Sequence, residues 1–324
     1  MAIRWPFGKK AAAPNNTARP QTSIYGMGQP QWTEWNIEAY YVEGLNNPYL
    51  FRAYDLISEC CASVNAFPYD ANDKDIKDPD LLKFLETPNP YQGRKEWLKE
   101  MFLHFLIGGQ AFGLSVDTSM ANDGSKPPTE IYAFGANKMA VKSPANIGDP
   151  LGFVYKPKGT DIDIDPRRVF WFKSVNPRNV FDGLPATQAA GKSVDANNSY
   201  LDFIRKLFLN EGIPPSTVSA KEGSVLSPSQ RKDIKEMWYA KTGQSLLALD
   251  GGVSIQPLGW NPKDMDMKTL YDGNVREIGV ALGISPILLG DASQSTYSNY
   301  EAARAQLYLE KVLGSSTRVQ MSEV

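Results

Sequence analysis

A run of residues that could bind nucleotide phosphates lies near the middle of the chain. The segment Ala186-Thr187-Gln188-Ala189-Ala190-Gly191-Lys192-Ser193 fits a relaxed phosphate-loop pattern, with alanine in place of the first glycine. In such a loop Lys192 would reach the β- and γ-phosphates, and Ser193 would ligate a magnesium ion. Further along, Asp250 follows the apolar run 246–249, where a magnesium-holding carboxylate would stand. Together these residues describe an ATPase.

The residues around this segment favour a different interpretation, a helix start with a chance Gly-Lys-Ser. A phosphate loop follows a buried parallel strand directly, whereas here the turn Phe181-Asp182-Gly183-Leu184-Pro185 comes first. The segment holds a single glycine, so the backbone nest that cradles phosphate is hard to form. Asp250 precedes Gly251-Gly252, a pair that suits a hairpin turn equally well. The ATPase is therefore kept as an alternative hypothesis.

Few side chains could hold a metal ion or act as a nucleophile. The single histidine, His104, lies in the apolar run 101–106, whereas a zinc site needs several clustered nitrogen or sulfur ligands. A Ser-His-Asp triad would have to use the same histidine, and no Gly-x-Ser-x-Gly elbow accompanies it. Cys60 and Cys61 are adjacent and have no other cysteine to pair with, which fits a reducing cytosol. We expect no metal, no cofactor and no catalysis through such a triad.

The composition is that of an ordinary soluble globular protein. The 324 residues include 34 Lys and Arg against 36 Asp and Glu, a formal net charge of -2, with 42% hydrophobic and 22% charged residues. These values exclude a disordered chain, a coiled-coil rod and a collagen-like repeat. They also argue against a sequence-specific DNA reader, which usually has a basic excess. No signal peptide is visible and no apolar run is long enough for a bilayer, so we expect a protein that stays in a cytoplasm.

Apolar spacing, capping residues and turns predict helices first, then strands, then helices again. Helices are expected over 47–66, 80–86 and 94–107, the last strongly amphipathic and closed by Gly108-Gly109. Short antiparallel strands are expected at 111–116, 130–134, 153–155, 169–172 and 246–249. Further helices are expected at 199–209, 227–239 with Ser227 as N-cap, 264–282 and 300–313. The order is α+β without regular strand–helix alternation, and residues 1–36 indicate a flexible N-terminal arm.

An ordered series of motifs in both halves of the chain resembles the HK97-type phage portal protein family. The second half contains Ile278-Gly279-Val280-Ala281-Leu282-Gly283-Ile284-Ser285-Pro286, followed by Thr296-Tyr297-Ser298-Asn299. The first half contains Pro88-Asn89-Pro90, Gly108-Gly109-Gln110-Ala111-Phe112 and Asp182-Gly183-Leu184-Pro185-Ala186, similar to the family's Pro-Asn, Gly-Asn-Ala-Tyr and pre-stem turn segments. This chain departs from the family in having Gly109-Gln110 for Gly-Asn, in Ser285 before Pro286, and in stopping soon after its last expected helix.

The resemblance implies a portal-type fold that assembles as a ring. It has a mixed helical and β wing, a two-helix stem and a small α/β clip insert. Carried onto this sequence, the wing would be 37–183, the stem 184–209 and 264–283, and the clip 210–263. Residues 284–324 would hold the channel loop and a C-terminal wing or truncated crown helix. A capsid-associated adaptor without a channel is the other alternative.

The function that the resemblance implies is a channel rather than an enzyme. A ring of twelve subunits would stand at one vertex of a capsid and let double-stranded DNA pass non-specifically during genome packaging and ejection. Its partners would be the large terminase subunit, a head–tail connector or adaptor, and the major capsid protein, with no membrane involved. The protein would be part of the virion and be assembled in the cytoplasm of a host bacterium.

The same resemblance points to residues that would meet DNA or partners. The polar, nearly uncharged loop near 290–300 contributes small groups that can touch phosphates without holding them: Gln294, Ser295, Thr296, Tyr297, Ser298 and Asn299. Lys263 and Lys268, near the clip end of the stem, are candidates for non-specific, salt-dependent phosphate contact. In the clip, the candidates for subunit or partner contacts are Ile213, Pro214, Pro215, Val218 and Val225. For a channel, a net charge of -2 indicates the absence of a strong grip on DNA.

Overall fold

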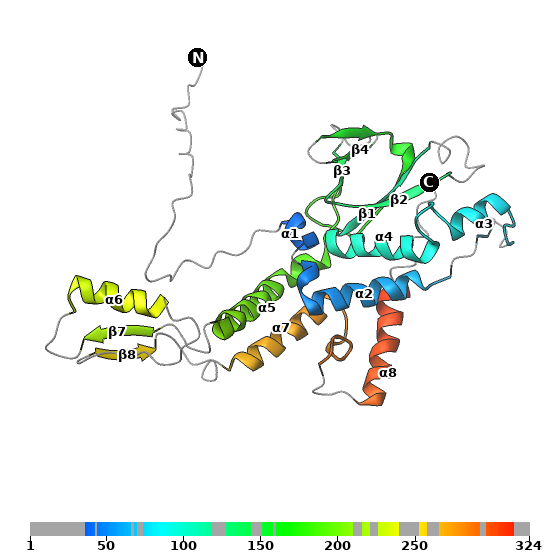
Figure 1. The fold of residues 1–324 in the computed structure, drawn as a ribbon. Helices are drawn as coiled ribbons and strands as arrows, with labels where there is room; N and C mark the ends of the chain where they lie inside the picture. Colours follow the sequence, from blue (N-terminus) through cyan, green and yellow to red (C-terminus); the bar gives the residue numbers. More distant parts are fainter. Residues whose placement is uncertain are drawn as a thin grey trace, which may run out of the picture. The chain divides into compact units, whose positions relative to one another are not determined.

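The computed structural model describes most of the chain beyond the N-terminal arm (Figure 1). The described residues are 36–42, 44–65, 68–69, 74–117, 128–143, 151–157, 160–209, 216–220, 226–239, 253–257, 266–291 and 296–313. The expected arm over 1–36 lies outside these ranges except for Asn36, whose side chain accepts hydrogen bonds from the first turn of α1 (Ile37–Val42). Within the described ranges, no helix combines the length and the apolar character that a membrane span requires.

Helix α2 (Pro48–Ala62) is the centre of the main hydrophobic core. It follows the short 3-10 turn η1 (Gly44–Asn46), and Asn47 caps it by accepting hydrogen bonds from the amides of Tyr49 and Leu50, both at 3.1 Å. The apolar side chains on one side of the helix are buried, with Leu50 and Tyr54 fully so. They pack against α5, α7 and the C-terminal helices, so this core joins segments from both ends of the chain.

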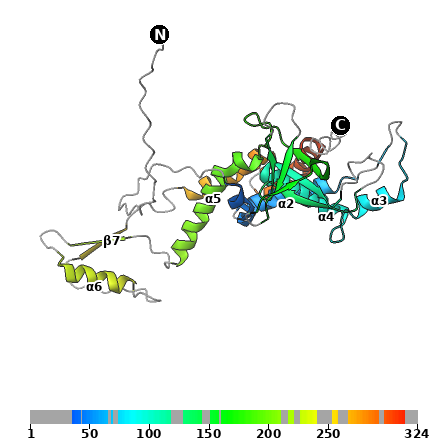
Figure 2. The same cartoon turned by 90° about the horizontal axis from the view of Figure 1, so that it is seen from above.

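Helix α4 (Arg94–Gly108) lies between α2 and a β-sheet (Figures 1 and 2). Ion pairs from Lys99 to Asp55 and Glu59 hold it to α2, at 2.7 and 3.0 Å. On the opposite side Met101 packs against the sheet. The prediction of a strongly amphipathic helix is therefore wrong, because apolar side chains surround α4 to meet neighbours on both sides. Its expected end is confirmed, since Gly109 adopts φ 73° and donates to the Phe105 carbonyl at 2.8 Å.

Two small antiparallel sheets face each other beyond α4. The first has the order β2 (Ile131–Gly135), β1 (Gln110–Ser115), β6 (Val169–Lys173), and the second β3 (Met139–Lys142), β4 (Gly152–Tyr155), β5 (Ile162–Ile164). Side chains alternate along β1, so that Ala111 faces α4 and Phe112 enters the core between the sheets with Met139 and Phe153. Strands β1, β2, β4 and β6 confirm the prediction, whereas β3 and β5 were not predicted.

Two glycines let the turn after α4 cross the segment that leads into α5. A Cβ atom at Gly183 would lie 1.9 Å from the Gly109 carbonyl oxygen, and one at Gly109 would lie 2.5 Å from the Pro185 nitrogen. Ser174 lies beside this crossing, with its hydroxyl 3.0 Å from the Gly109 oxygen and 2.6 Å from the Leu184 oxygen. Two of the motifs that carry the family resemblance are therefore in direct contact.

Two long helices enclose the insert. Helix α5 (Ala186–Leu209) begins at the segment 186–193, as the helix-start interpretation of that segment predicted, and it includes the helix expected at 199–209. Helix α7 (Met267–Leu282) follows the insert, close to its prediction. Between them lie β7 (Ser216–Ala220), α6 (Pro228–Tyr239) and β8 (Val253–Pro257), with β7 and β8 paired antiparallel. Ser227 caps α6 as predicted, because its hydroxyl accepts from the Gln230 amide at 3.2 Å. The strand predicted at 246–249 lies outside the described residues.

The chain after α7 turns at Gly283 and returns to α2. Gly283 ends α7 with φ 66°, and the 3-10 turn η4 (Pro286–Leu289) buries two leucines in the main core. Helix α8 (Tyr297–Gln306) continues into the π-helical turn η6 (Leu307–Val312), which packs on α2. The predicted helix at 300–313 therefore exists but starts three residues earlier. A separate short helix, α3 (Pro79–Glu86), is capped by Asp78.

Candidate functional site

The predicted stem is an antiparallel helix pair. Ser193 of α5 hydrogen-bonds Glu277 of α7, and seven residues further along α5 the ring of Tyr200 lies 4.6 Å from that of Tyr271. As the residue number rises along α5, the number of the contacting residue on α7 falls, so the two helices run in opposite directions. This arrangement brings both ends of the insert to the same end of the pair.

A chain of buried hydroxyl groups fixes the start of α5 to α2 and α4. Thr187 donates to the Leu106 carbonyl at the end of α4 (2.8 Å), so its oxygen accepts from Tyr54 of α2 (2.6 Å). Burial raises the pKa of Tyr54 well above its ordinary value, which keeps this phenol protonated as the donor. One threonine side chain thus joins α2, α4 and α5.

A second polar cluster holds the middle of the stem against the beginning of α2. The Asn47 amide donates to Asn197 (3.0 Å) and to Asn198 (2.8 Å) on α5. Beside it, the Tyr271 hydroxyl of α7 donates to that of Tyr49 at 3.3 Å, and burial is the main cause that raises the pKa of Tyr271 to about 12. The middle of the helix pair is therefore fixed by polar contacts to residues far away in sequence.

The phosphate-loop pattern does not form a loop. Residues Ala186–Ser193 are the first two turns of α5, and Thr187, Ala190 and Gly191 are buried. Gly191 lies under Tyr40, since a Cβ atom there would come within 2.6 Å of the Tyr40 hydroxyl. The hydroxyl of Ser193 contacts Glu277 rather than an open phosphate site. The structure contradicts the nucleotide site, and its predicted carboxylate, Asp250, lies outside the described residues.

The predicted DNA-channel residues fall partly in a helix. Thr296 caps α8, with its hydroxyl accepting from the Asn299 amide at 3.2 Å. Tyr297, Ser298 and Asn299 form the first turn of α8 and are exposed, so the expected loop is shorter than predicted. Lys268 is exposed in the first turn of α7. Lys263, Gln294 and Ser295 lie outside the described residues.

Only one of the predicted clip contacts can be placed. Val218 lies in the middle of β7, opposite Ile255 of β8. Ile213, Pro214, Pro215 and Val225 lie outside the described residues. The grouping of these residues into one partner surface stays a prediction.

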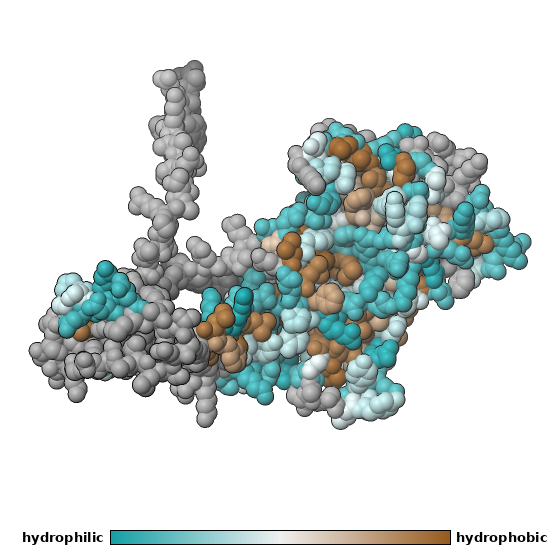
Figure 3. Space-filling view, in the orientation of Figure 1, coloured by the Kyte–Doolittle hydropathy of each residue, from teal (hydrophilic) through white to brown (hydrophobic). Residues whose placement is uncertain are grey.

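Sequence reasoning missed the exposed apolar residues at the outer end of the stem. No residue of α5 beyond Asn197 is buried, yet this half carries the large apolar side chains Leu201, Phe203, Phe208 and Leu209, and Leu270 of α7 is exposed at the same end (Figure 3). Val280 is exposed in the last turn of α7, at the opposite end of the helix pair. Phe208 is 77% exposed and Val280 75%. A helix pair with apolar residues on its outward side calls for another surface to cover it. The apolar residues of 199–209 predict a helix, but helical spacing alone does not show which of them a neighbouring element covers.

Sequence reasoning also missed an ion pair that closes the turn after α7. Arg276 donates to Asp291 at 2.9 Å, and this carboxylate is the main cause that raises the pKa of Arg276. The contact ties the body of α7 to the start of the segment that leads to Thr296. In the described part of the chain, no cluster of three or more His, Cys, Asp or Glu side chains could hold a metal ion.

Comparisons with known proteins agree with this architecture. Curated relatives include the portal protein of Enterobacteria phage HK97, 26% identical over 76% of this chain and 58% of that protein, and an uncharacterized protein of Rickettsia bellii, 28% identical over 72% and 61%. The chain thus spans about three fifths of the length of these two relatives.

Solved structures with a similar fold include a chain of a phage-like particle and a phage portal protein. A chain from the neck of an empty gene transfer agent particle is 28% identical, with a TM-score of 0.66 over 90% of this chain and 80% of that one. An HK97-family portal protein from Corynebacterium diphtheriae shares the fold at 13% identity, with a TM-score of 0.56 over 80% of this chain and 82% of that one. The family model described as phage portal protein matches residues 48–319. This chain therefore belongs to the phage portal protein family.

Proposed function

We propose that this chain is the subunit of a portal ring at one capsid vertex. The ring would serve as the channel for genome packaging and ejection. The observation that carries the proposal is the family match over residues 48–319, joined to the likeness to neck chains of gene transfer agent particles. One of those necks was computed with C12 symmetry, which supports a ring of twelve subunits. The role is structural and requires no catalytic residue.

The outer stem supports assembly into a ring. Its exposed apolar residues need a partner, and in a ring each subunit can cover a different surface of the next one. Such head-to-tail contacts close on themselves when the rotation between neighbours divides a full turn. The outer half of α5 and the exposed side of α7 are the surfaces we assign to this contact.

We assign the parts of the chain as the resemblance suggests. The wing is 37–183, the stem is 184–209 with 264–283, the clip is 210–263, and 284–324 holds the channel loop and the last wing helix. In support, the turn at Gly183 and the hydroxyl of Thr187 mark where the wing meets α5. The clip would dock the large terminase subunit and the head–tail connector, and the wing would meet the major capsid protein. Assembly would take place in the host bacterial cytoplasm.

DNA contact is assigned to the loop before α8 and to the basic residues near the clip. Gln294, Ser295 and Thr296 would line the narrowest part of the channel, with the exposed first turn of α8 behind them. Lys263 and Lys268 would contact phosphates without reading bases, so DNA retention should weaken as salt rises. Such contacts are weak enough individually for DNA to slide past them.

Electron microscopy of the purified chain tests the ring. We expect rings with a central hole wide enough for duplex DNA, roughly 20 Å. The double variant Leu201→Glu with Phe208→Glu, on the exposed outer stem, should abolish rings while leaving the circular dichroism spectrum unchanged. A ring without a through-hole would favour the adaptor instead, and monomers at all concentrations would contradict the proposal.

Replacing residues 292–295 with Gly-Ser repeats tests the channel loop. This change leaves Thr296, the cap of α8, in place. We expect rings to form normally and DNA packaging or retention to fall. Packaging at the normal level in this variant would refute the assignment of the loop to the channel.

A further inference from the structure

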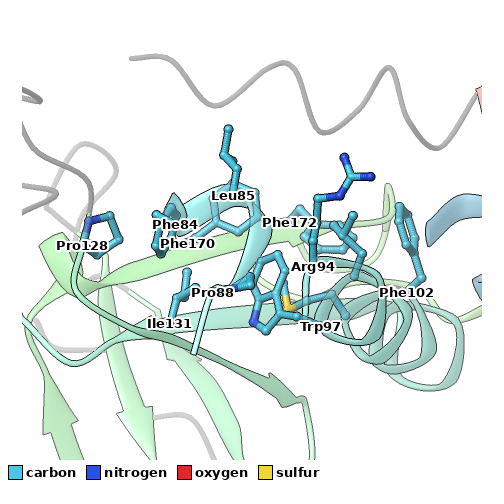
Figure 4. A pocket seen from close by; sticks show the side chains of 12 residues that line it. Phe84, Leu85, Pro88, Arg94, Trp97, Phe102, Pro128, Ile131, Phe170 and Phe172 are labelled. Atoms are coloured by element: carbon cyan, nitrogen blue, oxygen red, sulfur yellow. The ribbon is translucent and has the colours of Figure 1, made fainter. Parts of the chain in front are cut away.

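An apolar cavity of about 270 Å³ lies between α3, α4 and the β1 sheet (Figure 4). Helix α3 contributes Phe84 and Leu85 to its wall, although none of the residues of α3 is fully buried. Aromatic rings from α4 and β6 form much of the remaining wall, among them Trp97, Phe170 and Phe172. A space of this size and chemistry suits one or two apolar side chains.

Two hydrogen-bond donors at this cavity favour a bound group that carries hydrogen-bond acceptors. The indole nitrogen of Trp97 is buried and has no hydrogen-bond acceptor among the described residues. Arg94 is the one charged residue of the lining, and its guanidinium points away from the rings (Figure 4). It donates to Asn65 at 2.9 Å and forms no ion pair within the described ranges, so most of its five N–H donors can serve another group. A peptide supplies what both need, a backbone carbonyl and a carboxylate.

We propose that residues 314–324 of the same chain dock here as an extended segment, with Val319 and Met321 in the cavity. Side chains two residues apart lie on the same side of an extended chain, so Val319, Met321 and Glu323 share one side. Methionine is flexible and its sulfur packs favourably against aromatic rings, which suits this wall. Glu323 would then meet Arg94, and a backbone carbonyl of the segment would accept the Trp97 N–H.

The end of the described chain lies within reach of the cavity. Val312 is buried in the main core, where η6 packs on α2, and α2 in turn packs on α4. Packed helices lie about 8–10 Å apart, so the axis of α4 is roughly 16–20 Å away and its far side about 5 Å further. Eight residues separate Leu313 from Met321, and extended chain spans up to about 3.3 Å per residue, or roughly 26 Å. The segment can therefore pass α4 and enter the cavity of its own subunit.

Binding of a labelled peptide of residues 314–324 to the intact chain tests the proposal by competition. A tethered segment acts at an effective concentration of about 1 mM, so the intact chain should bind the peptide weakly. Releasing the tail with Val319→Ala and Met321→Ala should strengthen peptide binding at least tenfold. Gln320→Ala, on the opposite side of the extended segment, is the matched control and should change nothing.

A substitution in the cavity wall is tested in the released chain, which is the chain carrying Val319→Ala and Met321→Ala. Trp97→Phe keeps the ring and removes the N–H donor, and loss of one hydrogen bond should weaken peptide binding roughly twofold to tenfold. Equal peptide binding by the intact and released chains would overturn the proposal. So would the absence of binding by the released chain, or a peptide with Met321→Ala that binds as tightly as the native one. Dimers of the intact chain that disappear in the Val319→Ala, Met321→Ala variant would also overturn it. They would show that the tail docks in the cavity of a second copy of the chain.

Discussion

Replacing Gly183 with alanine tests the crossing that joins the turn after α4 to the start of α5. The new Cβ atom would lie 1.9 Å from the Gly109 carbonyl oxygen and 2.4 Å from its carbon. Since real Cβ atoms stay at least about 3.0 Å from such atoms, the two backbone segments must separate by roughly 1.1 Å. This would also pull apart the two carbonyls that Ser174 bridges. We expect a loss of about 3 kcal/mol in the free energy of unfolding.

Urea unfolding at one fixed protein concentration measures this loss, with Gly273→Ala as the matched control. Gly273 lies in α7, and a Cβ atom there would meet no heavy atom within 4 Å. Because alanine is favoured over glycine inside a helix by roughly 0.5–1 kcal/mol, the control should be stabilised. The two glycine-to-alanine changes should therefore shift the urea midpoint in opposite directions at an unchanged m-value. A Gly183→Ala midpoint at or above that of the native chain would refute the reasoning.

Three further predictions concern the wing, its acid stability and the discarded nucleotide site. Thr187→Val leaves the buried Tyr54 hydroxyl without its acceptor and should cost about 1–3 kcal/mol in urea unfolding, whereas Thr187→Ser should cost much less; equal losses would contradict the hydroxyl chain. The imidazole of His104, 3.6 Å from the carboxylate, is the main cause that lowers the pKa of Glu100 from its ordinary value, and a hydrogen bond from Gln92 adds to it. The stabilising contribution of Glu100 is therefore present above its ordinary pKa and lost as the pH falls through the lowered folded-state value. Glu100→Gln should therefore flatten the fall of melting temperature in acid, and an unchanged pH profile would count against this. Calorimetric titration with MgATP should show no binding by the native chain, because Ala186–Ser193 is helical; saturable binding that Lys192→Ala removes would restore the ATPase hypothesis.

Elements specified by their own residues were predictable, and elements that depend on partners were not. Asn47-Pro48 and Ser227-Pro228 start helices through local capping, so α2 and α6 were found from the sequence. Strands β3 and β5 are short, and each pairs only with β4, so long-range pairing makes them strands. The environment of α4 was mispredicted for a related reason, because spacing along one helix does not reveal how many neighbours it has.

The first half of α5 carried a signal that hydrophobicity alone could not reveal. Its buried positions, at 187, 190, 191, 194 and 197, follow helical spacing, but most of these residues are small or polar. The Gly-Lys-Ser pattern drew attention to phosphate chemistry at the same place. The tyrosine pair of Tyr49 and Tyr271 joins residues 222 positions apart, so only the folded chain brings it together.

The partial burial of α5 has a mechanical consequence. The helix has 24 residues and a length of about 36 Å, but its buried residues end at Asn197, so among the described residues the support of the outer half comes from its pairing with α7. Such a helix pair is a beam clamped at one end, whose free tip deflects most under a sideways load. In an isolated subunit the tip is compliant, whereas neighbours along the apolar side would brace it. Assembly would then set the stiffness of the stem as well as its position, and a single subunit would give a poor measure of the forces that the complete ring withstands.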